Sequence, residues 1–269
     1  MILEYHRPKS VESALKLLKR DAPTTMPLGG GTYLNSPMSE TVAVVDLQEL
    51  GLDEIEKEGN TLRIGARVTL QTLVEREDIP LALQAAIRKE AGINLRRTAT
   101  LAGKVVTADG RSALATALLA LDATLHIARH GEKSQTLKIG ELLVERSMKG
   151  SATRGLRGGL ITHLNLPVPG AVRLAYQDVA RTPADRPLVC AAAAIWESGR
   201  TRVTLGGAGN APILVLDGPQ IEAAESVQRA AQAAYSQTGD EWASAAYRQH
   251  AAGILARRCF ADLINGQPE

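Results

Sequence analysis

The chain places three glycines in a row, Gly29-Gly30-Gly31, directly after a short apolar stretch. Residues 23–28 are apolar enough to predict a strand that ends at these glycines. Glycine has no Cβ and adopts positive φ angles, so such a segment lets another molecule approach the backbone closely. Successive backbone N–H groups at a strand end can form a nest for phosphate. A tight turn that needs only flexible backbone explains the same residues, and both interpretations remain open at this point.

Composition and charge restrict the class of protein. The 269 residues are enough for one large domain or two of ordinary size. Thirty-one basic and 29 acidic residues give a net charge of +2 without long blocks, which argues against nucleic acid or an anionic membrane as partner. The lone cysteines, Cys190 and Cys259, cannot by themselves hold an iron–sulfur cluster or a Cys-based zinc ion. They fit a reduced, cytoplasmic setting.

No targeting or membrane-spanning segment is expected. Residues 1–10 mix Glu, His, Arg, Pro and Lys, unlike a signal peptide. The longest apolar stretches, 113–121 and 188–196, are about half the length that a bilayer requires. We therefore expect a cytoplasmic protein with no membrane span.

The expected helices and strands divide the chain into three parts. Residues 1–58 predict a β-α-β unit whose helix is capped by Ser10. Residues 59–168 predict a second unit that mixes strands with helices beginning near Thr69 and Pro80. After the linker at 167–170, residues 171–269 predict three consecutive antiparallel strands and then two Ala-rich helices, an α+β module.

Several familiar kinds of site are excluded. Gly103-Lys104 lacks the rest of a P-loop, and the glycine triplet lacks the G-x-G-x-x-G spacing of a Rossmann fold. His126 and His130 have helical metal spacing but lie in a predicted strand and turn without a third ligand. No nucleophile or acid–base arrangement stands out, so we assign no catalytic and no metal-binding residue. A bound cofactor would have to carry any redox chemistry.

Two small-residue segments together carry a family resemblance. The first, Gly-Gly-Gly-Thr-Tyr-Leu at residues 29–34, compares with the family pattern A-G-G-(Q/T)-(S/D)-L. The second, residues 96–104, compares with R-N-x-G-T-(I/L)-G-G-N and is followed by a helix of the L-x-A-L-x-A type at 118–123. Val45-Asp46-Leu47 and residues 62–66 agree with two further short sequence motifs of the same family. On these residues the chain resembles the FAD-binding medium subunit of molybdenum hydroxylases, the group of carbon monoxide dehydrogenase and xanthine dehydrogenase.

The resemblance implies an α+β fold. A two-subdomain FAD-binding domain of the vanillyl-alcohol-oxidase-like type (1–58 and 59–168) would precede a C-terminal three-stranded antiparallel sheet with helices (171–269). FAD would lie between the subdomains, with its pyrophosphate on the N–H groups of both segments, hydroxyl donors nearby and a residue of the 160–166 strand near the flavin ring. The implied FAD-binding residues are Leu28, Gly29, Gly30, Gly31, Thr32, Tyr33, Leu34, Thr100, Leu101, Ala102, Gly103, Lys104, Thr107, Asp109, Ile161 and Gln177.

The resemblance also implies partners. Iron–sulfur clusters on a small subunit and the molybdenum cofactor on a large subunit would supply electrons, which pass through FAD to NAD, a quinone or oxygen. The chain departs from the family pattern at Glu90, Ala102, Lys104, Ala113 and Gln177, and Lys104 would offer a cation to the pyrophosphate. These departures keep a second hypothesis open, a FAD-less structural or assembly subunit. A third hypothesis is a related flavin oxidoreductase that acts alone.

Overall fold

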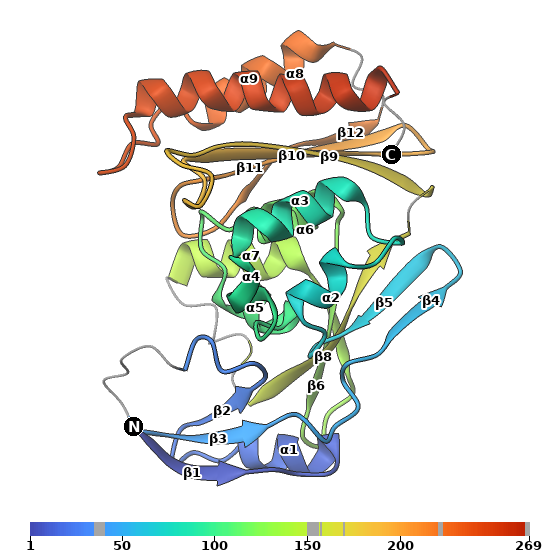
Figure 1. The fold of residues 1–269 in the computed structure, drawn as a ribbon, viewed down its shortest axis with the longest axis vertical. Helices are drawn as coiled ribbons and strands as arrows, with labels where there is room; N and C mark the ends of the chain where they lie inside the picture. Colours follow the sequence, from blue (N-terminus) through green and yellow to red (C-terminus); the bar gives the residue numbers. More distant parts are fainter. Residues whose placement is uncertain (35–40, 150–155, 157, 169, 220–222, 267–269) are drawn as a thin grey trace.

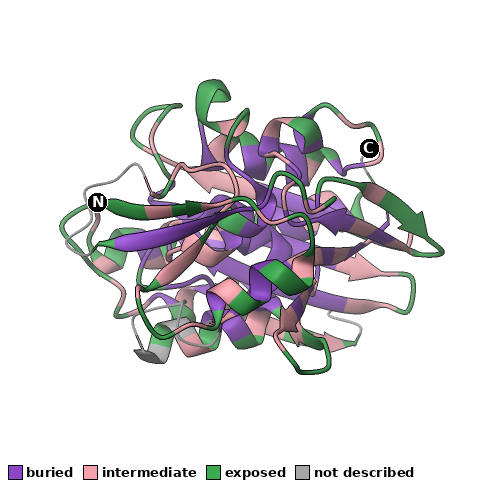
Figure 2. Cartoon of the chain, turned by 90° about the horizontal axis from the view of Figure 1, so that it is seen from below, coloured by how far each residue is buried: buried purple, intermediate pink, exposed green. Residues whose placement is uncertain are grey.

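The computed structural model describes residues 1–34, 41–149, 156, 158–168, 170–219 and 223–266, and these residues form three β-sheets (Figure 1). The N-terminal sheet lies at one end of the molecule. A group of helices separates the second sheet from the C-terminal sheet, and two further helices cover the outer face of the latter. Buried residues concentrate along the centre of these layers (Figure 2).

The N-terminal sheet confirms the predicted β-α-β unit. Its strands are all parallel, in the order β1 (Ile2–His6), β3 (Val42–Asp46) and β2 (Thr25–Leu28). Helix α1 (Val11–Leu18) begins at Ser10, whose hydroxyl accepts a hydrogen bond from the amide of Ser13 at 3.3 Å. The apolar face of α1 packs against buried residues of β3 and the segment that follows it.

The second sheet is antiparallel, and β8 is its central strand. The order is β4 (Ile55–Glu58), β5 (Thr61–Gly65), β8 (Gly159–Pro167), β6 (Thr124–Arg129) and β7 (Gln135–Lys138). Strand β4 forms within the largely polar stretch at residues 49–59. This strand is an edge strand with mainly charged, exposed residues, so its composition gives no hydrophobic signal.

Helices fill the space between the second and third sheets (Figure 1). They are α2 (Leu70–Val74), α3 (Leu81–Glu90), α4 (Ile93–Arg96), α5 (Leu101–Thr107), α6 (Ala113–Ala120) and α7 (Ile139–Lys149). The predicted helix starts at Thr69 and Pro80 are confirmed, and all residues of α6 are buried. The segment at 92–104 was expected to be a loop. It is largely helical instead, because it contains α4 and the start of α5.

The C-terminal sheet contains the three predicted antiparallel strands and one more. The order is β12 (Ile213–Pro219), β11 (Arg200–Gly206), β10 (Val189–Trp196) and β9 (Val172–Val179). Helices α8 (Ala224–Ala234) and α9 (Ala245–Ile264) cover one face, while α3 and α6 contact the other. The expected start of the first helix at residue 220 falls among residues 220–222, outside the described residues.

An ion pair connects the helical layer to the C-terminal sheet. Lys89 of α3 lies 3.2 Å from Asp178 of β9, measured from Nζ to Oδ2. Asp178 therefore lies at the interface between these layers, whereas Arg181 pairs locally with Asp185 at 3.5 Å. Among the described helices, none combines the length and the apolar character needed to cross a bilayer.

Candidate cofactor site

The glycine triplet begins where strand β2 ends. The carbonyl of Leu28 still accepts a hydrogen bond from the amide of Leu47 at 3.1 Å. Gly29 and Gly30 then bend away from the sheet, and Gly31 has φ +71°, a conformation that favours glycine. Within the described parts of the chain, no protein acceptor is recorded for the amides of residues 29–32. The first segment therefore presents a row of uncommitted backbone donors.

In the second segment, the backbone N–H groups at the start of α5 already donate hydrogen bonds within the protein. Thr100 caps α5 by accepting a hydrogen bond from the amide of Gly103 at 3.3 Å. The amide of Leu101 donates to the carbonyl of Val68 at 2.8 Å, and that of Ala102 donates to the carbonyl of residue 66 at 3.2 Å. The expectation of free N–H groups on both segments therefore needs correction: the first segment offers them, whereas these three amides of α5 have partners inside the protein.

The two segments lie in direct contact. A Cβ added at Gly30 would lie 1.7 Å from the carbonyl oxygen of Thr98, and one added at Gly29 would lie 2.9 Å from Oγ1 of Thr100. Since real Cβ atoms do not approach backbone atoms so closely, Gly30 is required for this contact. The structure thus brings together the two segments that sequence reasoning paired, one from each predicted subdomain.

The rest of the first segment follows the same turn. Thr32, Tyr33 and Leu34 continue it, and the side chain of Tyr33 is exposed. On the second segment, Leu101 and Ala102 are buried in the core. Their side chains therefore belong to the core that supports the second segment.

The polar residues predicted further along have partners within the protein. The ammonium of Lys104 lies 3.0 Å from Oε1 of Glu90. The hydroxyl of Thr107 donates to the carbonyl of Gly103 at 2.8 Å. Asp109 forms a two-pronged ion pair with Arg186, with one contact at 2.8 Å. None of the three side chains is recorded in contact with the glycine triplet within the described residues.

Ile161 shares a hydrophobic core with Leu101 and Ala102 of the second segment, whereas Gln177 lies on another sheet. Ile161 belongs to the hydrophobic core beneath the second sheet. Gln177 of β9 donates to Oδ2 of Asp262 on α9 at 3.0 Å, so it occupies the outer face of the C-terminal sheet. Its neighbour Asp178 faces the helical layer through the ion pair with Lys89. The structure does not bring Gln177 to the other predicted cofactor residues.

The histidines that were weighed as metal ligands have other neighbours. His126 stacks on His163 of the adjacent strand, with ring centroids 4.0 Å apart. His130 pairs with Glu12 of α1 at 2.6 Å. Among the described residues, no cluster of three His, Cys, Asp or Glu side chains is arranged to hold a metal ion.

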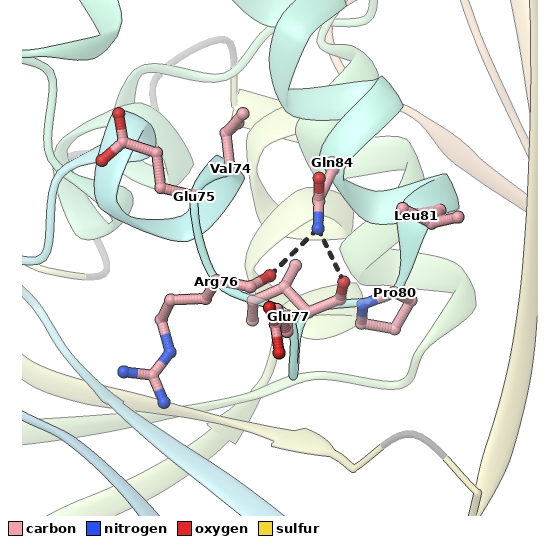
Figure 3. Close-up of a pocket in the computed structure, with 8 residues that line it drawn as sticks. Val74, Glu75, Arg76, Glu77, Pro80, Leu81 and Gln84 are labelled. Carbon is pink, nitrogen blue, oxygen red and sulfur yellow. Dashed lines mark hydrogen bonds between the residues drawn. The ribbon is translucent and has the colours of Figure 1, made fainter. Parts of the chain in front are cut away.

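A surface pocket between α2 and α3 is separate from the glycine segments (Figure 3). The Gln84 side chain closes the loop beneath it, because Nε2 donates to the carbonyls of Arg76 and Ile79, both at 3.0 Å. Arg76 also pairs with Asp78. No residue predicted for the cofactor lines this pocket, and we assign it no ligand.

Comparison with known proteins gives the family. Residues 1–169 match the model of the FAD binding domain in molybdopterin dehydrogenase. The chain is 30% identical to the uncharacterized protein YgfM of Escherichia coli K12, over 97% of this chain and 96% of that protein. It is 26% identical to the carbon monoxide dehydrogenase medium chain of Afipia carboxidovorans, over 95% of this chain and 94% of that one.

The fold agrees with this assignment. A chain in the crystal structure of the Cu,Mo-CO dehydrogenase superposes with a TM-score of 0.81 at 24% identity, and the match covers 97% of each chain. The resemblance inferred from the two small-residue segments is confirmed. The chain therefore belongs to the family of FAD-binding domains of molybdopterin dehydrogenases.

Proposed function

We propose that this chain is the FAD-binding electron-transfer subunit of a molybdenum hydroxylase-like oxidoreductase in the cytoplasm. Its partners would be a small subunit with iron–sulfur clusters and a large subunit with the molybdenum cofactor, and the final acceptor would be NAD, a quinone or oxygen. The names of its relatives support this proposal, since one is the medium chain of a carbon monoxide dehydrogenase and another is subunit alpha of the 6-hydroxypseudooxynicotine dehydrogenase complex.

The observation that carries the proposal is the row of uncommitted amides at residues 29–32, held against Thr98 and Thr100. A diphosphate carries two negative charges, and backbone N–H dipoles stabilise such charges without a cationic side chain. The residues present therefore fit the pyrophosphate of FAD on the side of the glycine triplet.

The residues of this chain would bind and orient the cofactor. The amides of residues 29–32 would donate to the pyrophosphate, with the hydroxyls of Thr32 and Thr100 beside them. Gly30 keeps the two segments in contact. The flavin supplies the redox chemistry when it is bound, and we assign no catalytic residue to this chain.

Purified protein tests the proposal directly. We expect a yellow protein with flavin absorbance that releases FAD on denaturation, and we expect apoprotein to take up FAD in a titration. Gly30→Ala should abolish or strongly weaken this uptake, because its Cβ collides with Thr98. Gly218→Ala is the matched control, since a Cβ there meets nothing within 4 Å. A colourless protein that takes up no FAD would contradict the proposal.

One observation favours the alternative of a FAD-less assembly subunit. The amides of Leu101, Ala102 and Gly103 are already used inside the chain, so donors remain mainly on one side of the site. Family membership argues for FAD. The same titration separates the two functions: an assembly subunit would form a stoichiometric complex with its partners while failing to bind FAD.

A further inference from the structure

Glu90 of α3 is a buried carboxylate that contacts two other helices. It is the last residue of α3, and its side chain is 2% exposed. Oε2 accepts hydrogen bonds from the hydroxyl of Ser112 at 2.8 Å and from the amide of Leu114 at 3.2 Å, both at the start of α6. Oε1 lies 3.0 Å from Nζ of Lys104 on α5. One side chain therefore connects the end of α3 to α5 and α6.

The charge of Glu90 depends on these partners. The N-terminus of α6 favours a negative charge, and Ser112 is the N-cap of that helix. A carboxylate removed from water is costly unless it is paired and hydrogen-bonded. Lys104 supplies the counter-charge. Removing either Lys104 or Glu90 therefore leaves the other side chain with an unpaired charge. From the sequence, Glu90 and Lys104 were identified only as departures from the family pattern. Nothing in the sequence indicated that they contact each other.

Helix α5 connects this ion pair to the candidate cofactor site. Its first turn follows Thr98 and Thr100, the residues in contact with the glycine triplet. The carbonyls of residues 66 and 68 hold that first turn. The pair between Lys104 and Glu90 holds the helix one turn later. Both attachments therefore hold the helix that directly follows Thr98 and Thr100.

We propose that Glu90 is a positioning residue for the cofactor site, which acts through Lys104 to fix α5 and so sets how tightly FAD is bound. The inference rests on the proposed function. It also gives Lys104 a role other than the one expected from the sequence, because its ammonium pairs with Glu90.

A double-mutant cycle tests this role. Glu90→Gln and Lys104→Gln should each weaken FAD binding about tenfold, because each breaks the ion pair that attaches α5 to α3. The double variant Glu90→Gln/Lys104→Gln should recover to within about threefold of the original affinity, since two neutral amides can bond to each other. The dissociation constant is measured by flavin fluorescence, alongside the midpoint of thermal unfolding for each variant.

Lys89→Gln provides the matched control. It breaks the ion pair between α3 and Asp178 but does not touch α5, so FAD affinity should stay unchanged. If the single variants unfold at lower temperature yet bind FAD as before, or if the double variant does not recover, Glu90 has no positioning role. Should Glu90→Gln fail to fold, Lys104→Gln alone decides, because Lys104 is partly exposed. Absence of FAD binding in the unaltered protein would instead contradict the proposed function.

Discussion

Gly110 and Gly207 bond to each other where the helical layer meets the C-terminal sheet. The amide of Gly207 donates to the carbonyl of Gly110 at 2.6 Å, and the amide of Gly110 donates to the carbonyl of Gly209 at 3.2 Å. A Cβ added at Gly110 would lie 1.9 Å from the carbonyl oxygen of Ala208. The two parts of the protein therefore meet backbone to backbone at this point, with no space for a side chain.

Replacing Gly110 by alanine should destabilise this junction. Because the added methyl group collides with backbone, which moves less easily than a side chain, we expect Gly110→Ala to lower the free energy of unfolding by about 1–3 kcal/mol. Chemical denaturation measures the change. Gly218→Ala serves as control, and an equal loss in both variants would show that close backbone contact is not the cause.

Arg248 should be among the most sensitive positions of α9. Its side chain is fully buried; Nη1 donates to the carbonyls of Leu188 and Gly207, and Nη2 lies 2.6 Å from Asp240. Arg248→Met leaves these acceptors unpaired, so we expect a loss of about 3–5 kcal/mol in the free energy of unfolding. Arg248→Lys should not restore it, because one ammonium cannot reproduce the fork of a guanidinium. Full stability of either variant in denaturant titrations would refute this expectation.

The stacked histidines should make stability depend on pH. Burial lowers the pKa of His163 to about 4, with a further contribution from His126, and burial also lowers the pKa of His126 below its usual value. The unfolded chain then binds more protons than the folded one in mildly acidic solution. The stability contributed by neutral His163 is complete above about pH 6.5 and is lost as the pH falls toward 4.

His163→Gln removes the group that titrates. Its midpoint of thermal unfolding should therefore fall less steeply between pH 7 and pH 4.5 than that of the unaltered protein. His250→Gln, at an exposed position of α9, is the control and should keep the original slope. If the unfolding midpoint depended on pH equally in all three proteins, His163 would not be the source of the pH dependence.

Competition between ligands should reveal which part of FAD the glycine triplet binds. If the amides of residues 29–32 bind the pyrophosphate, ADP should displace FAD measurably, whereas riboflavin, which lacks phosphate, should displace it far less. Gly30→Ala should abolish ADP binding as well. Fluorescence titrations with each competitor give the answer, and stronger displacement by riboflavin than by ADP would place the main contacts at the flavin ring.

Sequence patterns predicted the order of the main helices and strands. They did not predict that the second small-residue segment, residues 96–104, is largely helical. Glycine in a helix interior is unfavourable by about 1 kcal/mol, which made a loop the natural prediction around Gly103. The buried side chains of Leu101, Ala102 and Val105 pack into the core, and Thr100 caps the helix. Tertiary packing outweighs the local propensity there. The consequence for the site is direct, because a helix uses amides that a loop would leave free.

The position of Gln177 could not be predicted for a different reason. Strand β9 lies between two helical layers, so neither of its faces is open to solvent along most of its length. Alternation of polar and apolar residues then no longer tells which face a residue occupies. Strand β12 was missed although residues 213–216 are apolar. Pro212 precedes this short edge strand and Gly218 and Pro219 end it, and proline and glycine are typical of loops.

The central place of β8 determines when the protein can assemble during synthesis. This strand pairs with β5 on one side and β6 on the other, yet it is the last of the five to leave the ribosome. Until residues 159–167 emerge, the two halves of the second sheet have no common strand. The second sheet can therefore be completed only when almost the whole FAD-binding domain, residues 1–169, has been synthesised.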